Sequence, residues 1–316
     1  MLKTKVQRIT TTGMLMALGI MLPFAAAHGL GMQGSILLPM HIPVFLIGFL
    51  CGPLWGGICG LILPALNTVL TGMPPVFPML PIMTAELFVY GLISGLTYEK
   101  TFFGKMKLGV YPCILIAMIC GRIAYGLVFW AVMIGKKSAF WAVIGATGTG
   151  LPGIIIQLLL VPAIVIAVKN SFVKRDKDAR ASAINLIKED TATCVIIKNN
   201  TIIKTEKGRG IGPVIEMYES GVLKDTYFAD KIIGKAAAMI ITLGGVKGCY
   251  GEVMSIEAEK WLIQHGIEAD CGLKVETISN RTGDGMCPME QTVQGIDDPQ
   301  KGFEKLKDKL AQLRGN

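Results

Sequence analysis

The first half of the chain consists of long apolar runs that carry no polar face. A soluble helix keeps one side polar, whereas a helix that is apolar all round belongs in a protein interior or in lipid. These runs lie at 9–27, 38–51, 54–71, 80–98, 108–134 and 151–168. They predict an all-α membrane bundle of about six transmembrane helices. The run 38–51 is short for a span and, with 54–71, is also compatible with a tight hairpin at Gly52-Pro53.

Apolar and polar residues alternate in the second half, which predicts a soluble three-layer α/β domain. The expected strands are 193–198, 201–205, 246–253 and 273–279, and the expected helices are 179–189, 213–220, 230–243, 256–265 and 299–313. We therefore divide the chain into a membrane domain 1–173, a charged linker 174–184 and an α/β domain 185–316.

The charge of the chain is unevenly distributed. Residues 1–173 hold ten Lys or Arg against two Asp or Glu, and the remainder holds 21 of each, so the whole net charge of +8 lies in the apolar part. This is the basic flanking of membrane helices, and it does not indicate nucleic-acid binding. The basic residues near the N-terminus, in the loop 99–107 and after residue 168 predict that both termini are cytoplasmic in a multi-pass plasma-membrane protein.

Polar residues inside the apolar runs are costly in lipid and therefore indicate function. In the six-helix topology they fall at a common depth toward the outside, which predicts a pocket for a small polar molecule. The candidate binding residues are His41, Asn67, Glu86, Arg122, Tyr125 and Gln157. A purely structural ion pair between Glu86 and Arg122 is the alternative. Gly13 and Ala17 on the first helix are small residues that favour close helix contact, either within the bundle or with a partner.

Four sequence segments followed by Glu86 carry a resemblance to a transporter family. The segments are Leu38–Pro43, Gly48–Pro53, Leu70–Pro75 and Phe77–Pro81. Residues 1–173 thereby resemble the substrate-binding S component of energy-coupling-factor (ECF) vitamin transporters. The resemblance implies capture of a vitamin-like solute from outside and docking on a membrane T component driven by two ATPases. The chain itself contains no Walker motif, so ATP would be used by those partners. Gly13 and Ala17 take the first two positions of the family's AxxxA docking pattern, and Met21 stands at the next.

The soluble half offers a second group of candidate site residues. Lys235 begins an apolar helix, and Cys287 precedes a proline at an expected helix start, where a thiol is activated in some enzymes. Either is a candidate nucleophile, although a buried, inert thiol is the alternative for Cys287. The full candidate set is Asp230, Lys235, Asn280, Arg281 and Cys287.

Residues 185–300 resemble uncharacterised domains with a cytidine-deaminase-like fold. The resemblance rests on Gly208–Gly210, Gly234–Ala238, Glu252–Ser255 and Cys287–Glu290, among others. Zinc deaminases require His or Cys ligands and a catalytic Glu, and the corresponding stretches here lack them. We therefore expect no metal site, no cofactor in this chain and no zinc-dependent deamination. The alternative to a transport subunit is a membrane-anchored enzyme or ligand sensor whose soluble domain modifies or senses the imported compound.

Overall fold

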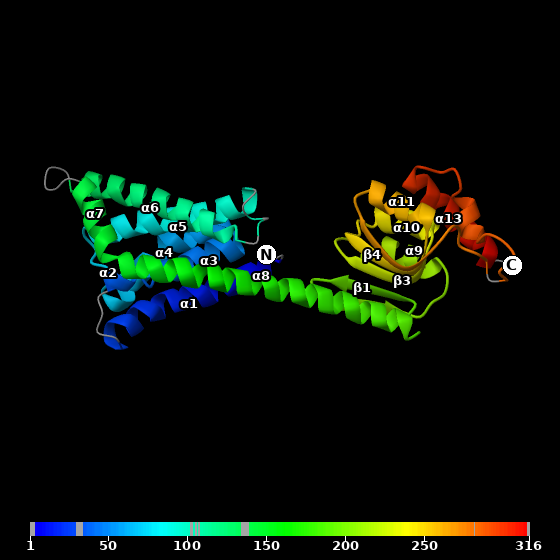
Figure 1. The fold of residues 1–316 in the computed structure, drawn as a ribbon, viewed down its shortest axis with the longest axis horizontal. Coiled ribbons are helices and arrows are strands. Elements are labelled where there is room, and N and C mark those ends of the chain that lie inside the picture. The colour runs from blue at the N-terminus through cyan, green and yellow to red at the C-terminus, as the bar shows by residue number, and fades with distance from the viewer. Residues whose placement is uncertain are drawn as a thin grey trace. The chain divides into compact units, whose positions relative to one another are not determined.

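The computed structural model describes residues 4–29, 34–101, 104, 106, 108–133, 139–280 and 282–314. The chain forms two compact units, Met1–Ser171 and Phe172–Asn316. The described part of the first unit consists of helices and their connections, and the second is α/β (Figure 1). Because each unit has its own fold, they are described separately below.

The helices of unit 1 reproduce most of the apolar runs. They are α1 (Lys5–Gly29), α2 (Gly34–Leu37), α3 (His41–Cys51), α4 (Pro53–Thr71), α5 (Met79–Lys100), α6 (Val110–Val132), α7 (Ala139–Thr149) and α8 (Leu151–Lys188). Among the described residues, five of these are long and apolar enough to cross a membrane, namely α1, α4, α5, α6 and α8. The structure thus supports a helical bundle with several apolar helices.

Helix α3 differs from the expected second span. It has 11 residues, and at about 1.5 Å per residue it reaches only about 16 Å, half of a hydrocarbon core. All of its residues are buried, and it packs against α1, α4 and α5. The short segment is therefore the interior helix of unit 1.

Helices α4 and α5 approach each other closely because glycines face each other at their crossing. A Cβ on Gly91 would stand 2.2 Å from the carbonyl oxygen of Gly56, closer than any side chain permits. Small residues allow this kind of backbone contact between apolar helices. The crossing fixes α5, which carries Glu86, against the centre of the bundle.

Two further elements of unit 1 differ from expectation. Helix α7 lies within the segment expected to be an outer loop. The expected break between a last span at 151–168 and a helix at 179–189 does not exist, because α8 is one helix through the charged stretch. Its charges support the helix, since Arg180 pairs with Asp176 one turn earlier at 3.0 Å.

Unit 2 contains a five-stranded mixed sheet in the order β2-β1-β3-β4-β5. The strands are β1 (Cys194–Lys198), β2 (Thr201–Glu206), β3 (Tyr227–Ile233), β4 (Gly248–Ser255) and β5 (Glu268–Val275). β1 pairs antiparallel with β2 and β3, whereas β3, β4 and β5 are parallel. Parallel neighbours require crossover helices, and these are α10 (Lys235–Leu243) and α11 (Ile256–Gln264).

Helices cover both faces of the sheet. One face packs on the core formed with α9 (Gly212–Glu219), α10, α11 and α13 (Pro299–Arg314), and a short helix, α12 (Pro288–Thr292), lies before α13. The opposite face packs against Ala183 and Ile187 at the end of α8. In Figure 1 the strands lie between these two layers.

The expected helix at 230–243 is wrong in its first third. Residues Tyr227–Ile233 form the central strand β3, and α10 begins only at Lys235. Asp230 and Lys231 interrupt the apolar pattern within β3, and Ile232 and Ile233 lead directly into the apolar helix α10, so the sequence did not separate the strand from the helix. The last expected strand also lies earlier than predicted, at Glu268–Val275.

Candidate functional site

The centre of unit 1 holds a buried carboxylate. Glu86 on α5 is only 2 % exposed. Its Oε1 accepts a hydrogen bond from the hydroxyl of Tyr90 at 2.8 Å and lies 3.0 Å from Nη1 of Arg122. Nε2 of His41 lies 3.7 Å from the other carboxylate oxygen. A buried charge is tolerated only with such partners, so these four side chains form one polar cluster in an apolar bundle.

Three helices position this polar cluster of His41, Glu86, Tyr90 and Arg122. Glu86 and Tyr90 lie four residues apart on α5 and so share one face. Tyr90 packs its ring against Phe45 of α3, with ring centroids 4.8 Å apart. Arg122 reaches the cluster from α6, where the adjacent Gly121 leaves space for the Tyr90 ring.

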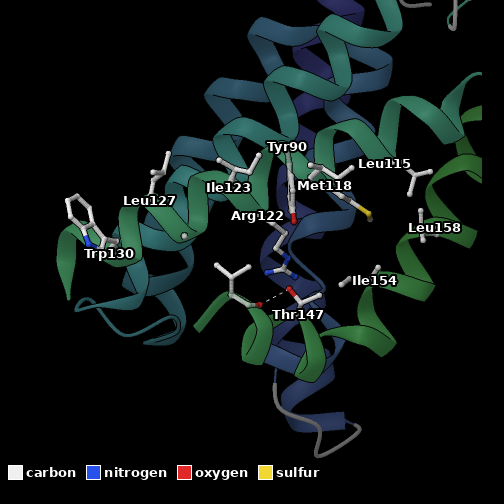
Figure 2. A pocket seen from close by; sticks show the side chains of 13 residues that line it. Tyr90, Leu115, Met118, Arg122, Ile123, Leu127, Trp130, Thr147, Ile154 and Leu158 are labelled. Carbon is white, nitrogen blue, oxygen red and sulfur yellow. Dashed lines mark hydrogen bonds between the residues drawn. The ribbon is translucent and has the colours of Figure 1, made fainter. Parts of the chain in front are cut away.

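A cavity of about 670 Å³ opens beside the polar cluster (Figure 2). Arg122 and Tyr90 contribute to its wall, and the remaining lining comes mainly from apolar side chains of α6, α7 and α8. These are Leu115, Met118, Ile119, Ile123, Leu127, Trp130, Val143, Ile154 and Leu158, with Gly126 and Thr147. Ligand pockets commonly have this volume and this combination of apolar walls with few polar groups.

The structure brings together some of the sequence-predicted residues and separates others. His41, Glu86 and Arg122 meet, and Tyr125 lies near them, with the guanidinium carbon 5.9 Å from its ring centroid. Asn67 instead donates to the carbonyls of Gly19 and Leu63, both at 3.2 Å. Asn67 therefore links α4 to α1 through a hydrogen bond, and it does not line the cavity.

Gln157 also lies outside the polar cluster. Its side chain is buried and donates to the carbonyl of Leu38 at 3.4 Å. This bond ties the first turns of α8 to the segment before α3. Gly13 and Ala17, the expected docking residues, are exposed on α1, and a Cβ at Gly13 would meet no atom within 4 Å.

Tyr90 is the main functional residue that sequence reasoning missed. An aromatic residue in an apolar helix reads as core, and Tyr90 is indeed 2 % exposed. The available signal was its spacing of four from Glu86, which places a hydroxyl on the same helix face as the carboxylate. Thr147 was missed because α7 was expected to be a loop.

In unit 2, Lys235 and Glu290 lie together at the start of α10. The carboxylate of Glu290 accepts from the backbone N–H groups of Lys235 and Ala236, at 2.9 and 3.0 Å. It thereby caps the helix with a negative charge. Burial raises the pKa of Glu290, and the two N–H donors act in the opposite direction. The Lys235 ammonium is 2.7 Å from Glu257, so it is held as an ion-pair partner.

The other candidates of unit 2 do not converge on Lys235. Asp230 lies on β3, where burial raises the pKa of its carboxyl to about 7. Asn280 closes a loop through Asp284 and Gly283, with bonds of 2.7 and 2.8 Å. Cys287 is partly buried immediately before α12.

Arg281 lies outside the described residues. Among the residues that the structure describes, no group of three or more His, Cys, Asp or Glu side chains is placed to hold a metal ion.

Comparison with known proteins separates the same two parts of the chain. The family model of the ECF transporter, substrate-specific component, matches residues 7–165, and the model of a domain of unknown function (DUF1893) matches residues 182–310. A crystal structure of a DUF1893 family protein (TM1506) from Thermotoga maritima is 24% identical, covers 42% of this chain and 90% of that chain, and has a TM-score of 0.40. No curated protein matches the chain.

A bundle of apolar helices around a buried charged cluster, with a cavity beside it, indicates a multi-pass membrane protein. The family match over half of the chain specifies this further. The chain belongs to the ECF transporter substrate-specific component family, and it carries a C-terminal DUF1893 domain.

Proposed function

We propose that this chain captures a small vitamin-like solute from outside the cell and passes it inward through an ECF-type importer. The observation that carries the proposal is the cavity of about 670 Å³ with Arg122 and Tyr90 in its wall. Family membership supports association with ECF components. Transport would then depend on a T component and two ATPases, since a bundle with a pocket needs an external motor.

The distribution of basic residues supports an outward-facing cavity. Arg8 and Glu99 both lie within 4 Å of the Cβ position at Gly52, and Lys169 donates to the carbonyl of Gly104 at 3.3 Å. The start of α1, the end of α5 and the middle of α8 around Lys169 therefore lie at one end of unit 1, where basic residues gather. The positive-inside rule assigns that end to the cytoplasm. The cavity includes Ile154 and Leu158 from the first turns of α8, toward the opposite end.

The exposed face of α1 supplies a surface for the T component. Gly13 and Ala17 lie on this face, beside the exposed side chains of Met14 and Leu18. Small residues permit close approach of a partner helix, and the flanking apolar side chains suit contact within the bilayer.

For unit 2 we propose a zinc-less deaminase-like fold on the cytoplasmic side. Its strand order, with an antiparallel pair followed by parallel strands, supports this assignment. The helix start at Lys235, where a deaminase holds its metal, is occupied here by the carboxylate of Glu290. These contacts favour a role other than metal-dependent catalysis.

The test is reconstitution of the full chain with a T component and both ATPases in proteoliposomes. The solute is first identified by mass spectrometry of what co-purifies with the chain. We expect ATP-dependent accumulation of that solute, and loss of it in Gly126→Leu, which fills the cavity next to Val143. Gly145→Leu is the matched control, because a Cβ there meets no atom within 4 Å. Accumulation without ATPases, or none with them, would contradict the proposal.

A further inference from the structure

The walls of the cavity continue into the lipid-facing surface of α6. Ile119, Ile123 and Leu127 line the cavity and are each more than half exposed in unit 1, at 62%, 57% and 62%. In a bilayer such side chains face hydrocarbon. A solute whose body lies along them must itself be apolar, since polar groups placed there would lose water without gaining partners.

The two hydroxyl groups in the cavity wall already donate to protein acceptors. The Thr147 hydroxyl donates to the carbonyl of Val143 at 2.7 Å (Figure 2). The Tyr90 hydroxyl donates to Glu86 at 2.8 Å. Arg122 has five N–H donors, and Nη1 lies 3.0 Å from Oε1 of Glu86. The guanidinium therefore retains donors for a ligand, and a planar anion with two oxygens fits this fork.

Glu86 does not compete with a ligand inside the cavity. Its side chain is 3 % exposed and is not part of the cavity lining, whereas the Arg122 side chain is 15 % exposed and does line it. Glu86 thus lies behind the guanidinium and, with Tyr90, acts as a positioning residue that holds Arg122 in place.

We infer that the solute is a molecule with an apolar, ring- or chain-bearing body and a single carboxylate that pairs with Arg122. This inference rests on the proposed function, because it takes the cavity as the solute site. A cationic solute would face the guanidinium with like charge. A polyol or a heterocycle with many hydrogen-bonding groups would meet apolar walls along most of its surface.

The experiment measures binding to the full chain in lipid nanodiscs by titration calorimetry. The probes are 5-phenylpentanoate and its primary amide, 5-phenylpentanamide, which share the apolar body and differ in charge. We expect the carboxylate to bind about 10- to 100-fold more tightly than the amide, the ratio typical of a charge-assisted hydrogen bond. Arg122→Gln should reduce this ratio to about one while the amide still binds as tightly as it does to the unmodified chain, which shows that the cavity is intact. Arg175→Gln, at an exposed position on α8, is the matched control and should preserve the ratio.

Two results would overturn the inference. One is equal binding of the acid and the amide to the unmodified chain. The other is a preference for the acid that persists in Arg122→Gln. Failure of the proposed function is a separate outcome, seen as absence of ATP-dependent uptake for every solute. Uptake of a cation or polyol that Arg122→Gln leaves unchanged would refute only the carboxylate assignment.

Discussion

Glu86 shows how single residues keep a charge inside an apolar bundle. It is almost fully buried, yet a hydroxyl and a guanidinium contact the same oxygen at 2.8 and 3.0 Å. Removing one partner of a buried charge typically costs about 3–5 kcal/mol, because the other is left uncompensated. The ion pair and the proposed ligand contact of Arg122 are therefore compatible, since the carboxylate orients the guanidinium that lines the cavity.

At the residue scale, the sequence indicated which polar side chains in the apolar runs are unusual, but it did not indicate which of them lie together. Glu86, Arg122 and His41 lie together in the structure, as the rarity of ionisable side chains in apolar runs leads one to expect, and their role in binding stays a prediction. Asn67 and Gln157 obey the same rule of rarity, but they satisfy backbone carbonyls of neighbouring segments. Sequence cannot separate these cases, since both need the partner's position in space.

Asp230 gives a pH dependence that belongs to unit 2. Burial raises its pKa from 3.8 to about 7 in the folded state. The folded state therefore holds a proton that the unfolded state has released between about pH 4 and pH 7, so this group lowers stability as the pH rises through that window. Because Asp230 is only half-buried, solvent screens its charge and the loss of stability is about 2 kcal/mol.

The prediction is that Asp230→Asn removes this loss of stability. The test uses the fragment 172–316, which has its own hydrophobic core. The free energy of unfolding in urea should be larger for the variant than for the unmodified fragment at pH 8, and equal for the two near pH 4. Asp284→Asn is the control, since hydrogen bonds from Thr282 and Asn280 lower the pKa of that exposed carboxylate. A difference for Asp230→Asn that does not change with pH would refute the assignment.

At the scale of elements, the long and uniformly apolar helices were the predictable part. Five helices were recognised because nothing but lipid suits about 20 residues without a polar face. The interior helix α3 was not distinguishable from a short span, because both are apolar all round. Strand β3 was read as part of a helix for another reason, since Asp230 and Lys231 break its apolar run and the residues after them continue into the apolar helix α10.

A charged stretch was predicted to be a linker although it is helical. Residues 174–184 read as a linker because they are rich in Lys, Arg and Asp, but these are also acceptable helix residues on a solvated face. The Asp176–Arg180 pair and the packing of Ala183 and Ile187 on the sheet stabilise them as part of α8. Composition alone does not reveal such tertiary support.

The contact between α5 and α6 yields a prediction about helix packing. A Cβ at Gly121 would stand 2.1 Å from a ring carbon of Tyr90, and Tyr90 is fully packed on its other side by Phe45. Gly121→Ala should therefore displace Tyr90 and weaken its bond to Glu86, with a loss of about 1–3 kcal/mol from overpacking.

Thermal unfolding of the full chain in nanodiscs measures this effect. Gly145→Ala is the matched control on α7, because it adds the same methyl group where no atom lies within 4 Å. We expect Gly121→Ala to unfold at a lower temperature and to bind the co-purifying solute more weakly. Equal unfolding temperatures for the two variants would show that the α5–α6 contact tolerates a side chain.

At the scale of the whole molecule, the division into two units follows from charge and hydropathy. The excess of eight positive charges lies entirely in residues 1–173, whereas the remainder is balanced. The structure places the boundary of its compact units after Ser171, within the continuous helix α8. The membrane character of the first unit was thus readable from sequence, whereas the role of the second was not, because its candidate residues are separated in the fold.

Membrane orientation is the prediction that the whole molecule depends on. The basic residues near Gly52 and Lys169 lie at one end of unit 1, so the positive-inside rule puts the loop 72–78 outside and residues 172–316 inside.

Val76 lies in that loop and is 68% exposed, and Gln312 is exposed on α13. A membrane-impermeant maleimide should label Val76→Cys on intact cells and Gln312→Cys only after permeabilisation. The unmodified chain reports the background from its eight native cysteines. Labelling of Gln312→Cys on intact cells would show that the topology is inverted and that unit 2 is not cytoplasmic. The cavity of unit 1 would then open inward, and it could not capture a solute from outside.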